Sequence, residues 1–334
     1  MCTNVIYRDN HITLYNSDCR DMKELSDNSI HCVVTSPPYF GLRRYDGLPD
    51  SIWDEWKGQF GLEPTIEMYV NHSIEILREI KRVLRKDGVV FWNIGDSYAG
   101  SGNGASTNPD VLKNAKEVYN IGKQPKRKYT NGIKPKDLCL IPFRVALAAQ
   151  ADGWWVRSDI IWNKPNPMPE SVLDRPTDSY EHIFMFTKSA KYYWNIEAVR
   201  EPQLQCSIER MKRNHFTNYD PSYPASKPQR LHQGEAPLGD DAAEILGGRN
   251  IRNVWTFPTQ GYQDAHFATF PEELPERCIK AACPEDGIVL DPFGGSGTTG
   301  WVAKRLNRKC VMYEASPQYC DLIIKRNQQQ AIGV

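Results

Sequence analysis

Two short segments, far apart in the chain, contain residue types that can do chemistry. The first follows an apolar run at residues 30–34 and ends in two prolines and a tyrosine. Prolines end the strand expected there, so the Ser36 hydroxyl and the Pro37 carbonyl stay outside secondary structure and can accept hydrogen bonds from an exocyclic amine. Tyr39 offers an aromatic face on which a flipped base can stack. The alternative is that the diproline merely ends a strand. The reactive set in this loop is Ser36, Pro37, Pro38 and Tyr39.

The second segment is a glycine loop at residues 291–300, between an apolar strand and a helix. Its glycines, with Glu314 at the end of the next expected strand, match the spacing of a dinucleotide fingerprint, so an NAD-dependent dehydrogenase is a competing interpretation. No lysine follows the last glycine, which excludes a phosphate-binding P-loop. Asp291, ahead of the glycines, is not typical of the dinucleotide version. An acid there would lie beside a cationic ligand such as an ammonium or a sulfonium.

Alternating apolar strands and amphipathic helices must position both loops. We expect strands at 12–15, 30–35, 89–94, 155–162, 181–187, 288–290 and 309–313, and helices at 64–84, 142–151, 271–282, 301–306 and 317–329. The C-terminal part supplies only two strands, too few for a doubly wound sheet, so the others must come from the N-terminal half. Parallel βα units place their loops at the carboxyl edge of the sheet. The two loops should therefore face each other across that edge.

Two polar stretches interrupt this alternation. Residues 97–136 are rich in Gly, Asn, Ser and Lys and are expected to be a mobile basic excursion. Residues 196–262 are polar and weakly periodic, and are expected to be an inserted target-recognition region that divides the catalytic domain into 1–195 and 263–334. The formal net charge of zero argues weakly against nucleic acid, but basic residues gather in both stretches and fit phosphate contacts. The candidate DNA contacts there are Lys126, Arg127, Lys128, Arg210, Lys212 and Arg213.

Length and composition limit the size of the domain and the classes of protein to which the chain can belong. The chain has 334 residues, enough for one large α/β domain with an insertion. Its nine cysteines include no C-x-x-C pair, so we expect neither a metal site nor a disulfide framework. No stretch has the length of a membrane span, and the N-terminus lacks a signal-peptide core. These features indicate a reducing, cytoplasmic setting.

Taken together, the motifs resemble those of the amino-directed DNA methyltransferases that use S-adenosylmethionine. The order of catalytic loop, inserted region and glycine loop is similar to the β-type arrangement of that family. The resemblance covers residues 10–200 and 262–328, and includes the segments 82–88, 92–98, 180–184 and 266–274. It implies a Rossmann-like, doubly wound, mainly parallel α/β sheet with an antiparallel hairpin strand, and double-stranded DNA as the partner. A homodimer and a cognate restriction endonuclease are further partners compatible with it.

The resemblance also implies roles for single residues. Asp291 would lie near the ammonium of the cofactor, Glu314 would accept from its ribose hydroxyls, and Asp18 would lie near its adenine amino group. The other residues implied at the cofactor are Thr35, Thr269, Phe270, Phe293, Gly295, Gly297 and Thr298. Arg43 and Arg44, just past the reaction loop, are candidate contacts to phosphate or to the orphan base, and exposed surface arginines are the alternative.

The first residue of the reaction loop bears on the target base. Ser-Pro-Pro-Tyr resembles the N4-cytosine group, whereas Asp-Pro-Pro-Tyr is the usual N6-adenine form. Ser36 therefore predicts an enzyme that makes N4-methylcytosine, with N6-adenine methylation by the same fold as the alternative. A further alternative is a non-catalytic DNA-binding module, in which the Ser36 loop would have no chemical role.

Overall fold

A mixed sheet of nine strands, in the order β1-β2-β11-β10-β3-β6-β8-β7-β9, organises the part of the chain that the structure describes. The structure is a computed structural model that describes residues 5–42, 44–45, 47–54, 56–100, 132–203, 248–260 and 270–329. Five neighbouring strands run parallel to one another at its centre. They are β2 (Ile12–Tyr15), β11 (Lys309–Tyr313), β10 (Ile288–Asp291), β3 (Ile30–Thr35) and β6 (Leu84–Ile94).

Antiparallel strands flank this parallel centre. On one side β1 (Val5–Arg8) pairs with β2. On the other, β8 (Tyr180–Thr187) pairs with β6, and β7 (Trp155–Asn163) pairs with β8. The predicted class, a doubly wound and mainly parallel sheet with an antiparallel hairpin, is therefore confirmed.

Four short strands were not expected from the sequence, and β1 is the first of them. The strands β4 (Ser51–Trp53) and β5 (Trp56–Gly58) form a separate hairpin. The strand β9 (Val254–Thr256) pairs in parallel with β7, so the sheet extends into the range assigned to the inserted region. The largest difference in a boundary is at β6, which begins at Leu84 rather than at Val89.

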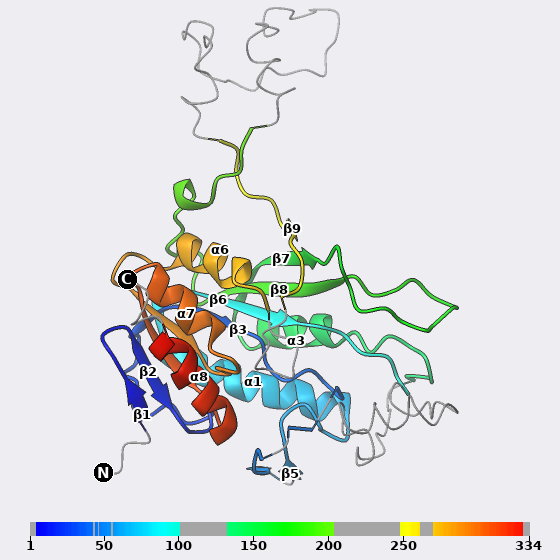
Figure 1. Cartoon of the computed structure of the whole chain (residues 1–334). Helices are drawn as coiled ribbons and strands as arrows, with labels where there is room; N and C mark the ends of the chain where they lie inside the picture. Colours follow the sequence, from blue (N-terminus) through cyan, green and yellow to red (C-terminus); the bar gives the residue numbers. More distant parts are fainter. Residues whose placement is uncertain are drawn as a thin grey trace, which may run out of the picture. The chain divides into compact units, whose positions relative to one another are not determined.

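Helices cover both faces of the sheet. Figure 1 shows β6 and β8 between α6 (Glu273–Ala282) on one side and α1 (Ile66–Val83) and α3 (Ile141–Ala151) on the other. The helices α7 (Thr298–Arg305) and α8 (Pro317–Gln329) complete the βα units of the C-terminal part. Because both faces are covered, the central strands are buried almost throughout, which explains their continuous apolar sequences. No helix in these described ranges is long and apolar enough to cross a membrane.

The chain divides into two units, one formed by Met1–Trp194 with Asn253–Val334 and the other by Asn195–Arg252. The sheet and its helices belong to the first unit. In the second, a short 3-10 helix, η2 (Glu197–Val199), is followed by backbone pairing between Glu201 and Arg249. The Glu201 carboxylate also binds the Arg249 side chain at 3.1 Å.

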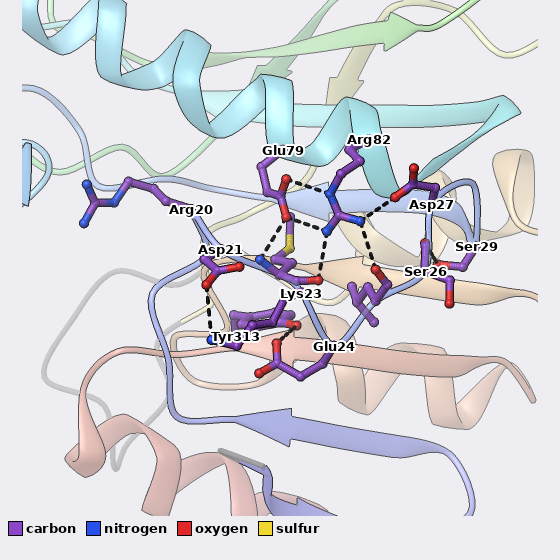
Figure 2. A network of polar contacts seen from close by, with 12 residues as sticks. Arg20, Asp21, Lys23, Glu24, Ser26, Asp27, Ser29, Glu79, Arg82 and Tyr313 are labelled. Carbon is purple, nitrogen blue, oxygen red and sulfur yellow. Dashed lines mark hydrogen bonds and ion pairs between the residues drawn. The ribbon is translucent and has the colours of Figure 1, made fainter. Parts of the chain in front are cut away.

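Within the first unit, Arg82 near the end of α1 binds the segment between β2 and β3. Its guanidinium donates to the carboxylates of Glu79 and Asp27, each at 2.6 Å, and to the backbone carbonyls of Met22 and Leu25, each at 3.0 Å. Glu79 in turn accepts from the Met22 backbone N–H at 2.9 Å. Figure 2 shows Arg82 between these acids, facing the segment. The chain between β2 and β3 is therefore fixed to α1 from several sides.

Replacing Arg82 by methionine should lower the free energy of unfolding by about 2 kcal/mol, because two carbonyls and two carboxylates lose their charged donor. Methionine keeps the apolar stem of the side chain, so the loss reports the polar contacts. A urea titration measures it. Lys23→Met is the matched control, because Lys23 forms only an exposed ion pair with Asp21 and should change stability by no more than about 0.5 kcal/mol. Equal effects of the two substitutions would contradict the role given to Arg82.

Candidate functional site

The two loops meet at the carboxyl edge of the sheet, as the sequence predicts. Strands β3 and β10 are neighbours, with Val33 opposite Leu290. Just beyond, the Thr35 hydroxyl donates to Asp291 Oδ1 at 2.6 Å. Residue 35 immediately precedes the reaction loop and residue 291 begins the glycine loop. A buried hydrogen bond therefore joins the two loops at their starting points.

Asp291 is a buried acid surrounded by neutral donors. Its side chain accepts from the hydroxyls of Thr35 and Thr299, at 2.6 and 2.7 Å, and from the Phe293 backbone N–H at 3.1 Å. Burial raises its pKa to about 6, and these hydrogen bonds only partly offset that rise. A buried carboxylate whose donors are all neutral is suited to a cationic ligand, since the ligand would supply the missing positive charge.

Glu314 holds the glycine loop from the end of β11. Its carboxylate accepts from the backbone N–H groups of Gly295 and Ser316, both at 2.8 Å. Burial raises its pKa to about 7, and the charge of Asp291 adds to the rise. Gly297, the N-cap residue just before Thr298, has φ of 78°, a conformation that favours glycine. The two acids and the glycine backbone together form a negatively charged cradle.

Aromatic rings connect this cradle to the middle of the sheet. The Phe293 ring stacks on Phe60 with centroids 5.8 Å apart, and it meets Trp92 edge-on at 6.3 Å. Phe293 is half-buried, so it can also flank a ligand. The Thr298 hydroxyl accepts from the buried Arg326 at 3.0 Å, and the predicted contact of Thr298 with the cofactor stays a prediction. Its polar group is engaged inside the protein.

Asp18 lies after β2 and already has a cationic partner. Arg20 binds its carboxylate at 2.7 Å, and the Ser51 hydroxyl donates to it at 3.1 Å. Burial disfavours the charged form of Asp18, but the hydrogen bonds from Arg20 outweigh it and lower the pKa. The Arg20 guanidinium also lies 4.0 Å from the Trp53 ring centroid. The predicted contact of Asp18 with an adenine amino group stays a prediction.

The other predicted cofactor and DNA contacts lie outside the two loops or outside the described residues. Phe270 is half-buried and lies just ahead of α6. Arg44 forms a surface ion pair with Asp50 at 2.9 Å. The other predicted contacts lie outside the described residues: Thr269, Arg43, Lys126, Arg127, Lys128, Arg210, Lys212 and Arg213. In the ranges that are described, no cluster of His, Cys, Asp and Glu is arranged to hold a metal ion.

The reaction loop is held rigidly around Tyr39. The Ser36 hydroxyl donates to Tyr39 Oη at 3.2 Å, and Tyr39 Oη donates to Glu181 at 2.6 Å. The Pro38 carbonyl accepts from Tyr69 Oη at 2.9 Å. The Tyr39 ring lies so close to Gly95 that a Cβ there would stand 2.7 Å from the ring. Burial, together with the charge of Glu181, raises the pKa of Tyr39 well above its usual value, which keeps its hydroxyl protonated.

Three polar residues at this loop were given no role in the sequence interpretation. Asn93, near the end of β6, donates from Nδ2 to Tyr39 Oη and to Glu181, both at 2.9 Å. Lys164, just after β7, forms an ion pair with Glu181 at the start of β8. Two of the three lie in segments that carry the family resemblance. Their convergence depends on the strand order β6-β8-β7, which the sequence does not specify.

Comparisons with known proteins agree with this geometry. The model of a DNA methylase family, of the N6/N4 type, matches residues 30–325. The Type II methyltransferase M.Cfr9I of Citrobacter freundii is 40% identical over 326 residues, which make up 97% of this chain and 90% of the relative. The Type II methyltransferase M.SmaI of Serratia marcescens is 37% identical over 310 residues, 92% of this chain and 88% of the relative.

Solved structures share the fold. The PvuII DNA methyltransferase (cytosine-N4-specific) superposes with a TM-score of 0.61 at 20% identity, covering 97% of this chain and 89% of that one. A putative DNA modification methylase from Thermus thermophilus, complexed with S-adenosyl-L-methionine, gives 0.53 at 21% identity, covering 96% and 95%. The dehydrogenase alternative receives no support from these matches. Because the family model spans most of the chain and the curated relatives match along nearly their whole lengths, this protein belongs to the N6/N4 DNA methylase family.

Proposed function

We propose that the protein is a site-specific DNA methyltransferase that transfers a methyl group from S-adenosylmethionine to the N4 amine of a cytosine flipped out of duplex DNA. The observation that carries this function is the joining of two loops at the ends of β3 and β10. The reaction loop presents Ser36. The glycine loop begins with one buried acid, Asp291, and is bound by a second, Glu314 at the end of β11. A nucleophile and a cationic donor would be held side by side.

The residues of the glycine loop fit the cofactor. Asp291 would face the ammonium group, and Glu314 would accept from the ribose hydroxyls in addition to its two backbone donors. Phe293 would flank the methionine part, with Gly295 and Gly297 allowing close approach of the backbone. When bound, S-adenosylmethionine supplies a methyl group activated by the positive charge on sulfur.

The reaction loop would activate the amine. The lone pair of an exocyclic amine is delocalised into the ring, so the amine is a poor nucleophile. Hydrogen bonds from the amine to Ser36 Oγ and to the Pro37 carbonyl would draw the nitrogen toward tetrahedral geometry and free that lone pair. Tyr69 binds the carbonyl of Pro38 and not that of Pro37, so the loop is anchored without using this acceptor. Positioning and fixed hydrogen bonds then favour in-line attack on the methyl group.

Two observations favour cytosine over adenine. Ser36 occupies the first position of the loop, as in the N4-cytosine group. The PvuII enzyme, which is cytosine-N4-specific by name, shares the fold along nearly the whole chain. N6-adenine methylation is the second candidate, because the acceptors of this loop would bind either amine.

The biological setting we propose is restriction and modification in the cytoplasm, since M.Cfr9I and M.SmaI are Type II methyltransferases by name. A cognate endonuclease would then be a partner of the pathway. Target recognition is proposed for residues 196–262 apart from β9, together with the basic stretch 97–136. The three residues of β9 are excluded because they belong to the sheet.

The test is methyl transfer from labelled S-adenosylmethionine to genomic DNA that lacks N4-methylcytosine, followed by digestion to nucleosides. Genomic DNA contains every short recognition sequence, so the target need not be known. The expected product is N4-methylcytosine. Label in N6-methyladenine would replace the cytosine assignment, and DNA without label would refute the enzyme proposal.

A further inference from the structure

A chain of hydrogen bonds with a fixed direction leads away from Ser36. Glu181 as a carboxylate only accepts, and the amide nitrogen of Asn93 only donates. Tyr39 Oη contacts both, at 2.6 and 2.9 Å, so its single hydrogen must point to Glu181. Its lone pairs then face Asn93 and the Ser36 hydroxyl, which donates to it at 3.2 Å. The hydrogens therefore run from Ser36 to Tyr39 to Glu181.

This direction determines what Ser36 offers to a substrate. A hydroxyl has one hydrogen and two lone pairs. Because the hydrogen of Ser36 is given to Tyr39, the oxygen can only accept. Asn93 Nδ2 makes a long contact with it at 3.4 Å, and the remaining lone pair is left for an incoming N–H group. If the chain ran the other way, Ser36 would present its hydrogen and compete for the lone pair that must attack. The orientation found here is the one that methyl transfer to an amine requires.

The hydrogen-bond chain ends at Glu181, and an ion pair fixes the position of this carboxylate and neutralises its charge. Lys164 forms an ion pair with one oxygen of Glu181, while the other oxygen accepts from both Tyr39 and Asn93. The Lys164 ammonium also lies 4.6 Å from the centroid of the Trp162 ring. Both partners of the ion pair are largely buried, with side chains 17% and 15% exposed. Glu181 is thus a fixed acceptor that is linked to Ser36 through Tyr39.

We propose that Glu181 is the positioning residue that sets the direction of the Ser36 hydroxyl and the final acceptor of the proton that the amine loses. This inference rests on the proposed function. It assigns the path by which the proton leaves the amine, which the roles of Ser36 and Pro37 do not specify. The carbon–nitrogen bond forms as the carbon–sulfur bond breaks, with its electron pair going to sulfur. The methylated amine, now cationic, gives a proton to Ser36 Oγ. Ser36 passes its own hydrogen to Tyr39, and Tyr39 passes its hydrogen to Glu181, which ends as a neutral acid beside Lys164.

The experiment measures single-turnover methylation of genomic DNA with labelled S-adenosylmethionine, for Glu181→Gln, Tyr39→Phe and the double variant. Glutamine keeps the shape but neither fixes the hydrogen direction nor accepts a proton as a carboxylate does. We expect Glu181→Gln to slow transfer about 100-fold, within the range for lost acid–base catalysis, with cofactor and DNA dissociation constants changed by no more than about twofold. The double variant should be no slower than Tyr39→Phe alone. Once Tyr39→Phe has removed the link between Ser36 and Glu181, losing the Glu181 carboxylate has no further effect on Ser36.

The control is Glu170→Gln. Glu170 lies in the connection that leads from β7 to β8, and its carboxylate binds Arg175 at 2.8 Å. This variant should keep the wild-type rate. A wild-type rate in Glu181→Gln, or a double variant slowed by the product of the single effects, would overturn the relay while wild-type labelling upheld the proposed function. The total label in DNA gives the transfer rate whether the target is cytosine or adenine, so it tests the proton path to Glu181 on either base. The nucleoside digest separately tests the cytosine assignment. Wild-type protein that transfers no label would refute both.

Discussion

Replacing Ser36 by alanine is expected to lower the single-turnover rate of methylation by about 100- to 1,000-fold, the usual effect of removing one preorganised hydrogen-bonding group from a reaction centre. Alanine removes the acceptor for the amine and the first member of the chain to Glu181. The rest of the loop keeps its anchors, since Tyr69 binds the Pro38 carbonyl and Tyr39 binds Glu181 without help from Ser36. The loss should therefore appear in the chemical step.

Cofactor binding distinguishes this effect from a folding defect. Calorimetric titration with S-adenosylmethionine should give a dissociation constant within about twofold of the wild-type value, because Asp291 and Glu314 are untouched. Ser29→Ala is a matched control, since Ser29 precedes the opposite end of β3 and its hydroxyl donates to the Ser26 carbonyl. It should methylate at the wild-type rate. Full activity in Ser36→Ala would remove the central residue of the proposed mechanism.

The sequence predicts the frame of the site because that frame depends on long apolar strands. Residues 30–35 and 288–291 are apolar runs followed by loops, and parallel strands place such loops at one edge. The hydrogen bond from Thr35 to Asp291 follows from that placement. By contrast, β9 has only three residues and lies next to a polar stretch, so its pattern is too short to detect.

Side-chain partners were harder to predict, since they depend on which strands become neighbours. Glu181 and Lys164 meet Tyr39 only because β8 and β7 pair beyond β6, an antiparallel addition that local sequence does not dictate. In a similar way, the engagement of Thr298 by Arg326 depends on how α8 packs against α7. Residue types identified the loops, whereas long-range packing decided which polar groups serve each loop.

Replacing Asp291 by asparagine should weaken binding of S-adenosylmethionine by about 100-fold, because loss of one charge from a buried, hydrogen-bonded pair costs about 2–5 kcal/mol. The change keeps the shape of the side chain. Its oxygen can still accept from Thr35 and Phe293, and the Thr299 hydroxyl has a second acceptor in the Val34 carbonyl at 3.4 Å. The variant should fold, so the lost affinity would report the charge.

Stability of the free protein should change in the opposite direction. The pKa of Asp291 is raised from 3.8 to about 6 in the folded state, so between these values the folded protein binds more protons than the unfolded chain. The contribution of this group to stability is full below pH 4 and is lost as the pH rises through 6. At pH 8 the ionised carboxylate therefore destabilises the fold by about 3 kcal/mol. Asp291→Asn removes that cost and should raise the free energy of unfolding at pH 8.

A variant that binds its cofactor more weakly while it unfolds less readily cannot be explained by misfolding. Urea titrations at pH 5 and pH 8, without cofactor, measure the stability change, and the gain over wild type should be largest at pH 8. Calorimetry between pH 5 and pH 7 measures the affinity, which in the wild type should rise up to about tenfold per pH unit below pH 6, as Asp291 ionises. Asp291→Asn should keep only the pH dependence due to Glu314, whose pKa of about 7 in the wild type should fall in this variant because the charge of Asp291 contributes to it. Unchanged affinity in this variant would show that the buried charge of Asp291 does not contribute to cofactor binding.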